Sequence, residues 1–424
     1  MKRTNTFEAI PQTESDRELL LRFLDASAAC WNEVNYRRRQ RFFEGEDVWE
    51  VDGVYDDYVG VLGGATAQAM IKRNESAWQS FFALLDDPSE DPSPPGYWGN
   101  EEDGRTLQTY VRNDAYDIQW GERSRLDIRV GQDLKEEFEM GYYERLRLDV
   151  RGNPHWDGKS GRLTIEYDDI DDTFRVYQPV TVAVDPGSES AGDEIAALDL
   201  GVNTLVACST TTGRRYLYHG RDLFERFRET TEEIARLRNQ LEDGQNTSRR
   251  IRRLYRTRSR RRDHAVDACV RDLVERLSDC GIRTVVVGDL SADFPVTGSS
   301  RANEMVHNFW SYGELTDQLR NVCEEQGITV ESRSEAGTSQ QCPDCGQAER
   351  TCRHQSTLTC ACGFEGHADL VASRNLLTRR IDNRTIARPM ARPVRFQWDN
   401  HEWRSTTDAS QSPTNSARTR KMSL

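Results

Sequence analysis

Four cysteines in the last third of the chain have the spacing of a metal site. They lie in the segments Cys342-Pro-Asp-Cys345 and Cys360-Ala-Cys362, with fourteen residues between the two pairs. Four thiolates on two turns suit tetrahedral zinc, and a site whose four positions are all occupied by protein is structural. Cys352 and His354 lie between the pairs and are alternative ligands. We expect a structural zinc ion to be bound by Cys342, Cys345, Cys360 and Cys362.

Two aspartates have the surroundings of metal-binding carboxylates. Asp199 follows an apolar run and precedes Gly201, so we expect its side chain at the mouth of a strand. Asp369 is expected in the first turn of a helix that ends near Leu377. Magnesium prefers oxygen ligands, and paired magnesium ions activate water and stabilise the leaving oxygen of a phosphodiester. The ordinary alternatives are a turn aspartate at 199 and a capping acid at 369.

A run of arginines stands out in this acidic chain. Apolar residues recur at helical spacing from Ile251 to Leu277, so we expect one long helix with an arginine face. The alternative is a charged helix that is only solvated. Guanidinium groups bind phosphates through paired hydrogen bonds, so we favour contact with the backbone of RNA or DNA. The predicted nucleic-acid-binding residues are Arg249, Arg250, Arg252, Arg253, Arg256, Arg258, Arg260, Arg261 and Arg262.

The elements that would position these residues follow a recognisable order after residue 194. The expected strands cover residues 195–201, 204–209, 214–218, 284–290 and 328–332, and the expected helices cover residues 221–242, 248–278 and 314–325. An antiparallel hairpin after the first strand, followed by strands alternating with helices, is the order of an RNase H-like fold. We therefore predict an α/β multidomain chain with an RNase H-like domain.

The first half of the chain has a different pattern and no catalytic constellation. Residues 15–86 show helical periodicity, and residues 88–104 form a polar, proline-bearing stretch. Half-buried strands are expected at residues 146–150, 161–167 and 174–177, where apolar and polar residues alternate. The segment 188–193 reads as a linker between the two halves.

Composition bounds the class of protein. The 424 residues predict two or more domains, and without a secretory leader or a long apolar run the chain is expected to be cytoplasmic, with no membrane partner. A net charge of -14 argues at first against nucleic acid. However, only five of the 57 basic residues are lysine, a composition that resembles proteins of salt-loving archaea. In molar salt the Debye length is about 3 Å, so net charge does not exclude a polyanionic partner.

Several short motifs resemble one family. They are ALDLGVN at 197–203, VVVGDL at 285–290, GTSQ at 337–340 and HAD at 367–369 with Arg374-Asn375. Together with the arginine run and the cysteines, they resemble TnpB (OrfB), the RNA-guided nucleases of bacterial and archaeal insertion sequences, which are related to type V CRISPR effectors. The resemblance covers most of residues 190–378. Looser matches upstream are WNE at 31–33 and AWQSFF at 77–82.

The resemblance implies a domain plan and partners. A guide RNA from the transposon end would pair with double-stranded target DNA, while the protein mainly reads shape and a short adjacent motif. The fold class becomes a RuvC-like RNase H domain with an inserted zinc ribbon, after a β-barrel-like wedge domain with a helical recognition insert. The implied domains are 1–190 (wedge and recognition), 191–335 (RuvC-like), 336–365 (zinc ribbon), 366–380 (closing helix) and 381–424 (a partly disordered tail).

Two positions depart from the family pattern. The family has glutamate where this chain has Gly288, which leaves Asp289 as the nearest carboxylate. Successive side chains of a strand point to opposite faces, so Asp289 would need a bulge or the strand end to take the same place. Val371 stands where the family commonly has asparagine.

Three functions therefore remain open. The first is a magnesium-dependent, RNA-guided DNA endonuclease linked to transposition and DNA recombination. The second is an RNA-guided DNA-binding protein that has lost cleavage through Gly288. The third is a zinc-containing DNA-binding accessory of transposition that uses no guide. For the first, the catalytic residues are predicted to be Asp199, Asp289 and Asp369.

Overall fold

The computed structural model divides the chain into two compact units, Met1–Asp185 and Pro186–Leu424. It describes residues 1–87, 90–100, 104–183, 194–201, 203–242, 245, 247–289, 309, 312–381 and 391–406. For Asp289 the description covers the backbone alone. The predicted linker at 188–193 lies outside the described residues.

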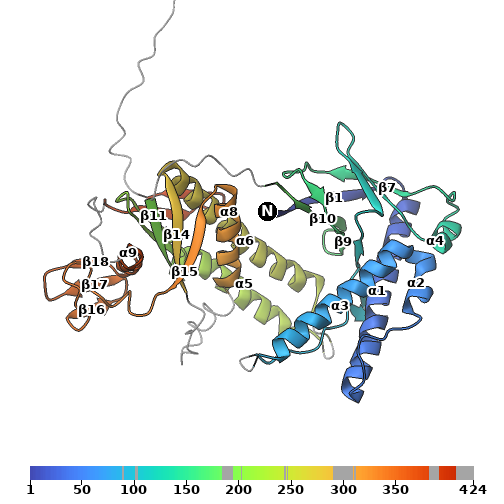
Figure 1. Cartoon of the computed structure of the whole chain (residues 1–424), viewed down its shortest axis with the longest axis horizontal. Helices are drawn as coiled ribbons and strands as arrows, with labels where there is room; N and C mark the ends of the chain where they lie inside the picture. The colour runs from blue at the N-terminus through green and yellow to red at the C-terminus, as the bar shows by residue number, and fades with distance from the viewer. Residues whose placement is uncertain are drawn as a thin grey trace, which may run out of the picture. The chain divides into compact units, whose positions relative to one another are not determined.

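The N-terminal unit is built on an eight-stranded antiparallel sheet (Figure 1). Its order is β4-β9-β10-β1-β7-β6-β5, and β8 pairs with β10. The strands are β1 (Lys2–Pro11), β4 (Gln108–Val111), β5 (Tyr116–Gln119), β6 (Arg125–Ile128), β7 (Leu146–Arg151), β8 (Lys159–Ser160), β9 (Leu163–Asp168) and β10 (Thr173–Thr181). The strands predicted at 146–150, 161–167 and 174–177 are confirmed, whereas the sequence analysis did not predict β1, β4, β5 and β6.

Four helices belong to this unit, and a short hairpin of β2 (Gly99–Asn100) and β3 (Gly104–Arg105) accompanies them. They are α1 (Glu14–Glu44), α2 (Val54–Leu62), α3 (Gly64–Leu85) and α4 (Gln132–Glu137). Helix α1 begins with a capping box between Thr13 and Asp16 and ends at Gly45, whose φ of 74° suits glycine. The predicted helical region is confirmed. Among the described helices of the whole chain, none combines the length and apolarity of a membrane span.

The C-terminal unit contains a seven-stranded mixed sheet in the order β15-β14-β11-β12-β13-β19-β20. The strands are β11 (Glu194–Leu200), β12 (Thr204–Thr210), β13 (Arg215–His219), β14 (Ile282–Asp289), β15 (Thr329–Ser334), β19 (Val394–Trp398) and β20 (Trp403–Ser405). β11, β12 and β13 are antiparallel neighbours, while β11, β14 and β15 run parallel. This is the predicted RNase H-like order. The sequence analysis did not predict that β19 and β20 would extend the sheet.

Helices cover both faces of this sheet (Figure 1). On one face, α5 (Arg221–Arg238), α6 (Arg249–Asp279) and α8 (Tyr312–Glu325) pack on alternate strand residues such as Leu198 and Val287. On the other face, α9 (Ala368–Arg380) places Leu376 and Leu377 against Ala197 and Val286. The alternation of strand side chains therefore assigns odd-numbered residues of β11 to the α9 face.

A small three-stranded sheet lies beside α9 and completes the unit. Its strands are β16 (Thr351–His354), β17 (Thr357–Cys360) and β18 (Glu365–His367). Leu358 of this sheet packs with Ala368 and Val371 of α9. Because Val371 is buried in this contact, an apolar side chain is favourable where the family commonly has asparagine.

Candidate active site and metal centre

Asp199 lies one residue before the end of β11, on the face that α9 covers. Its neighbours Leu198 and Leu200 are buried in the core on the opposite face. Asp199 as a residue is partly exposed, while its carboxyl group is largely withdrawn from water. The predicted location of Asp199 at the mouth of the strand is the location in the structure.

Asp369 reaches the same place from α9. The helix is anchored by a buried hydrogen bond of 2.8 Å between Ser373 Oγ and Ser209 Oγ of β12, and by Leu370 against Ala207 and Leu217. Burial and the negative charges of Asp369 and Glu335 raise the pKa of Asp199 well above its usual value. The structure thus brings together the two aspartates that the sequence analysis selected from distant segments.

Asp289, the third predicted carboxylate, ends β14 opposite Ser334 of β15. Its side chain lies outside the described residues, so its catalytic role stays a prediction. The neighbouring Gly288 is buried, and a Cβ built there would lie 3.1 Å from Cβ and 3.2 Å from Cδ of Glu335. Glu335 immediately follows β15, so this carboxylate occupies the space next to the missing side chain.

Sequence reasoning missed Glu335 although a signal for it was present. The parallel strands β11, β14 and β15 end at the same edge of the sheet, where such folds place their functional groups. An acidic residue directly after the last of these strands was therefore a candidate. The family motif at 285–290 contains Asp289 and not Glu335, so it selected Asp289 as the third carboxylate.

Two basic side chains approach Asp369. Arg353 of β16 donates from Nη2 to Asp369 Oδ1 at 3.2 Å, and its positive charge also acts on Asp199. His367 Nδ1 lies 3.9 Å from Asp369 Oδ2, and burial lowers the pKa of this imidazole. The small sheet thus contributes a cation to the carboxylate cluster.

The carboxylates are of the chemical type that binds a hard divalent cation, although among the described residues only the four cysteines lie close enough together to form a metal-binding group. Their oxygens are the donors that magnesium prefers. Burial, and after it the negative charges of Asp369 and Glu335, raise the pKa of Asp199, while the positive charge of Arg353 acts in the opposite direction. A divalent cation at this position would relieve the repulsion between these negative charges, so the residues present are compatible with the predicted magnesium.

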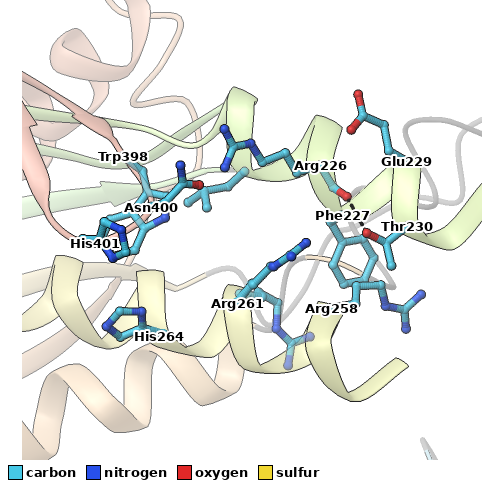
Figure 2. A pocket seen from close by; sticks show the side chains of 12 residues that line it. Arg226, Phe227, Glu229, Thr230, Arg258, Arg261, His264, Trp398, Asn400 and His401 are labelled. Carbon is cyan, nitrogen blue, oxygen red and sulfur yellow. Dashed lines mark hydrogen bonds between the residues drawn. The ribbon is translucent and has the colours of Figure 1, made fainter. Parts of the chain in front are cut away.

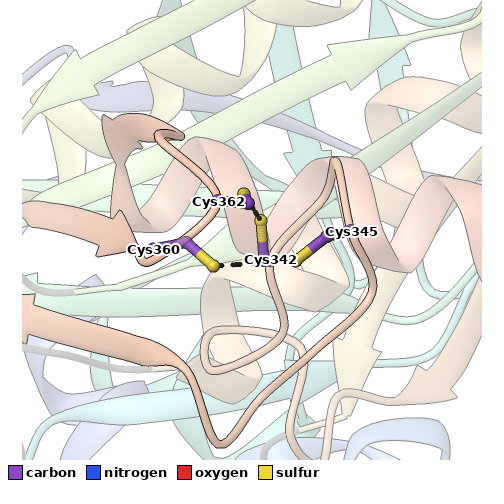
Figure 3. Close-up of side chains that lie close together, drawn as sticks. All are labelled: Cys342, Cys345, Cys360 and Cys362. Carbon is purple, nitrogen blue, oxygen red and sulfur yellow. Dashed lines mark hydrogen bonds between the residues drawn. The ribbon is translucent and has the colours of Figure 1, made fainter.

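The four predicted zinc ligands converge from two turns (Figure 3). Their sulfur atoms all lie within 4.8 Å of one another, and the closest pairs, Cys342 with Cys362 and Cys345 with Cys360, are 3.6 Å apart. A tetrahedral ion with Zn–S bonds of about 2.3 Å holds its sulfurs about 3.8 Å apart. The cluster therefore fits zinc. The alternatives Cys352 and His354 are exposed on β16 and take no part in it.

Local backbone structure explains why the cysteines converge. Gly346 donates its N–H to Cys342 O at 2.9 Å, and Gly363 donates to Cys360 O at 3.0 Å. Both glycines have positive φ, 74° and 97°, which lets the chain reverse directly after each pair begins. A backbone hydrogen bond from Gln347 lowers the pKa of Cys345 to about 7, whereas hydrogen bonds with the neighbouring cysteines raise the pKa of Cys362 to about 12, so only part of the cluster favours the thiolate before metal binds.

The metal centre is attached to the carboxylate site through α9. Asn375 donates from Nδ2 to Thr338 O and to Gln341 O, both at 2.8 Å. These carbonyls belong to the segment between Glu335 and the first cysteine pair. The resemblance selected Asn375, and the structure gives it a positioning role.

The predicted arginine helix is confirmed as α6, capped by the Ser248 side chain. Its arginines do not share one environment. Arg250 pairs with Glu233 at 3.1 Å, Arg262 pairs with Asp263 at 2.8 Å, and Arg258 lies 4.3 Å above the ring of Phe227. The exposed members are Arg249, Arg250, Arg252, Arg253, Arg260 and Arg261.

A pocket of about 570 Å³ lies between α5, α6 and the turn from β19 to β20. Figure 2 shows Arg226 and Arg261 in this space, with Trp398 and His401 at one end. Guanidinium groups beside aromatic rings suit phosphates and stacked bases. Sequence reasoning predicted Arg258, Arg261 and Arg262 of this pocket but missed Arg226, because α5 carries no run of arginines.

Two family models match segments of the chain between residues 177 and 376. Residues 177–292 match OrfB of IS605, described as a probable transposase. Residues 312–376 match the Cas12f1-like TNB domain, which includes the four cysteines and Asp369.

Comparison with curated proteins extends the likeness to the first half. The TnpB-like protein ORF457 of Acidianus two-tailed virus is 28% identical, over 94% of this chain and 91% of the relative. The CRISPR-associated endodeoxyribonuclease Cas12f1 of Sulfoacidibacillus thermotolerans is 28% identical, over 52% of this chain and 50% of the relative.

Solved structures show the same fold at low identity. A Cas12f1–sgRNA–target DNA complex matches with a TM-score of 0.58 and 13% identity, over 86% of this chain and 82% of the other. The mini-RNA-guided endonuclease Cas_phi3 matches with a TM-score of 0.51 and 11% identity, over 92% and 94%. The predicted fold class is confirmed. The likeness to ORF457 along nearly the whole chain, and both family models, support a relationship of this chain to TnpB proteins.

Proposed function

We propose that this chain is a transposon-associated, RNA-guided DNA endonuclease that hydrolyses phosphodiesters with magnesium. The observation that carries the proposal is the convergence of Asp199 and Asp369 at the carboxyl end of parallel strands in an RNase H-like sheet. Two carboxylates from distant segments, one of them nearly withdrawn from water, are an arrangement that a fold does not need for stability.

Asp199 and Asp369 would hold magnesium, and Asp289 stays the third predicted ligand. Bound magnesium activates water and stabilises the leaving oxygen of the scissile phosphodiester. The protein orients these carboxylates through the strand end of β11 and the anchored first turn of α9. Arg353 balances the charge of Asp369 and is placed to approach a phosphate that enters the site.

The other parts of the C-terminal unit would hold the nucleic acids. The Cas12f1 structure similar to this chain is a complex with a single guide RNA and target DNA. By this likeness, the partners proposed here are guide RNA from the transposon end and double-stranded target DNA. The arginines around the pocket of Figure 2 supply phosphate contacts, and zinc at the four cysteines stabilises the small sheet that carries Arg353.

A nuclease-inactive, RNA-guided DNA-binding protein is the second candidate. The observation that favours it is Gly288, which provides no side chain at the position where the family has glutamate. In that case guide and target would bind without cleavage. The third candidate, the guide-independent accessory of transposition, would need neither a guide RNA nor cleavage.

Cleavage of matched plasmid DNA separates the three candidates. The protein would be purified with RNA from the transposon end and assayed with magnesium in high salt. For the proposed endonuclease, Asp199→Ala abolishes cleavage and leaves RNA binding unchanged, whereas Asp279→Ala, at the end of α6 on the opposite face of the sheet, has no effect.

Each contrary result has one meaning. Guided binding without cleavage by the wild type would identify the inactive binding protein. DNA binding that needs no RNA would identify the accessory. Cleavage that survives Asp199→Ala would disprove the site.

A further inference from the structure

We propose that Glu335 is the third metal-binding carboxylate of this site and replaces the side chain that Gly288 lacks. This inference rests on the proposed function. It concerns a residue outside the motifs of the sequence analysis, and it would explain how the site can retain three carboxylates despite the departure at position 288.

The strand register places position 288, and not 289, on the face of Asp199. Ala197 pairs with Val286, so the next residues on that face are Asp199 and Gly288. In turn Gly288 is paired with Arg333 of β15. Glu335 follows Arg333 by two residues and therefore continues the same face.

The space beside Gly288 is already filled by this carboxylate. A Cβ at position 288 would meet Cβ, Cδ and Oε2 of Glu335, the first two at 3.1 and 3.2 Å. No other atoms are among the three nearest to that Cβ. A glycine at 288 and a glutamate at 335 are thus complementary, because a side chain at 288 and the present position of Glu335 exclude each other.

The backbone of Glu335 is fixed to the helix that carries Asp369. Glu335 O accepts hydrogen bonds from Thr338 N at 2.9 Å and from Thr338 Oγ1 at 2.8 Å. The buried Thr338 in turn gives its carbonyl to Asn375 of α9 at 2.8 Å. This short chain of bonds ties the turn after β15 to α9, so Glu335 and Asp369 keep their relative positions.

An independent observation at Asp199 points to a missing cation. Among the described residues, no hydrogen bond or salt bridge reaches the Asp199 carboxylate, although that group is largely withdrawn from water. Its surroundings include the negative charges of Asp369 and Glu335, which the positive charge of Arg353 opposes. A buried carboxylate without a hydrogen-bond donor is costly unless a ligand completes it, and a divalent cation fits this set.

The test measures metal binding and cleavage separately. Mn²⁺ serves as the probe, and its binding to the RNA-loaded protein is followed by electron paramagnetic resonance. We expect Glu335→Gln to weaken Mn²⁺ binding by at least about tenfold and to remove cleavage, as Asp199→Asn does. The matched control is Glu331→Gln on β15, because Glu331 is held by Arg380 at 2.7 and 2.9 Å.

A reciprocal variant guards against a merely structural effect. Gly288→Glu alone brings its new side chain into the space of Glu335 and is expected to lower the melting temperature. Combined with Glu335→Ala, it returns a carboxylate to the same place from the neighbouring strand. The double variant should therefore regain Mn²⁺ binding and cleavage relative to Glu335→Ala.

The outcomes distinguish this inference from the proposed function. If Glu335→Gln binds Mn²⁺ and cleaves like the wild type while Asp199→Asn does neither, the role of Glu335 is disproved and the nuclease stands. If the wild type does not cleave, yet its Mn²⁺ binding depends on Glu335, the ligand assignment stands and the nuclease falls. Mn²⁺ binding that ignores both Glu335 and Asp199 overturns the assignment.

Discussion

At the scale of single residues, the carboxylate site lowers the stability of the folded protein. Asp199 is withdrawn from water beside Asp369 and Glu335, and the hydrogen bonds that usually compensate a buried charge are absent from its carboxylate in the described part of the chain. Such a site is expected where function requires groups that the folded state alone would not favour.

Replacing the charge of Asp199 should therefore stabilise the metal-free protein. We expect Asp199→Asn to raise the free energy of unfolding by about 1–2 kcal/mol in the presence of chelator, because the cost of burying the Asp199 charge disappears together with its repulsion by two carboxylates. Urea denaturation measures this gain, with Asp279→Asn as the surface control. Added magnesium should narrow the difference, since it stabilises only the wild type. An equal or lower stability of Asp199→Asn would contradict the repulsion.

Arg353 should compete with the metal for Asp369. Its guanidinium lies 3.2 Å from Asp369 Oδ1, and about half of its side chain is exposed. Removing an exposed partner of this kind changes a charge interaction by about 0.2–1 kcal/mol, so Arg353→Ala should tighten Mn²⁺ binding by up to about fivefold. The same titration of Arg350→Ala, an exposed arginine of the same small domain, should match the wild type. Weaker binding in Arg353→Ala would show that the arginine orients Asp369 instead.

Residue identity could be predicted where sequence spacing carries the information. The cysteines, Asp199 and Asp369 each stand at a fixed offset from a recognisable strand, turn or helix. Glu335 could not be selected in this way, because its relation to Gly288 depends on the parallel pairing of β14 with β15 and on the turn that Thr338 closes.

At the scale of elements, we expect the small sheet of β16, β17 and β18 to depend on zinc bound by the four cysteines. Apart from Leu358, its strands contain mostly exposed or half-buried residues, so a large apolar core does not hold it together. Structural zinc supplies folding free energy to domains of this kind. The sheet in turn places Arg353 at Asp369. Zinc would therefore affect the carboxylate site only through the position of Arg353, and would take no part in the reaction.

Loss of one ligand should test this dependence. We expect the wild type to contain one zinc per chain, and Cys360→Ser to lose most of it and to expose residues 342–362 to proteolysis. Cys352→Ser is the matched control, since this exposed cysteine lies outside the cluster. Metal analysis and limited proteolysis give the two readouts. If Cys352→Ser loses zinc as well, the assignment of the four ligands is wrong.

The order of elements in the C-terminal unit was predictable because each element has a clear period or apolar run. The strands β1 and β4 of the first unit were not, because β1 buries the polar residues Arg3 and Asn5 and β4 is only four residues long. Strand β1 is stabilised by its two neighbours, β7 and β10, which come much later in the chain. The pairing of distant segments, and not local propensity, decides these strands.

At the scale of the whole molecule, the proposed function requires an acidic chain to bind a polyanion. A net charge of -14 repels nucleic acid over long distances at low salt, so binding must come from local groups. The lining of the pocket between α5 and α6 contains Arg226, Arg258, Arg261 and Arg262 and one acidic residue, Glu229, while Arg262 is also paired with Asp263 just outside the lining. This concentration of positive charge is the feature expected of a phosphate-binding surface on an otherwise acidic protein.

The salt dependence of RNA binding should report this pocket. Each phosphate contact contributes about 0.7 to the slope of log K against log salt for single strands and about 0.9 for duplexes. The exposed Arg226 and Arg261 should each contact one phosphate, so the double variant Arg226→Ala/Arg261→Ala should reduce the slope by about 1.4–1.8.

Filter binding from low to molar salt measures this slope for the double variant and for a control. Arg271→Ala is the control, because this arginine of α6 is paired with Asp267 at 3.1 Å and lies outside the pocket. A weaker affinity with an unchanged slope would mean that the two arginines act through protein packing. In that case arginines on another surface of the molecule must make the phosphate contacts that allow this acidic protein to bind RNA.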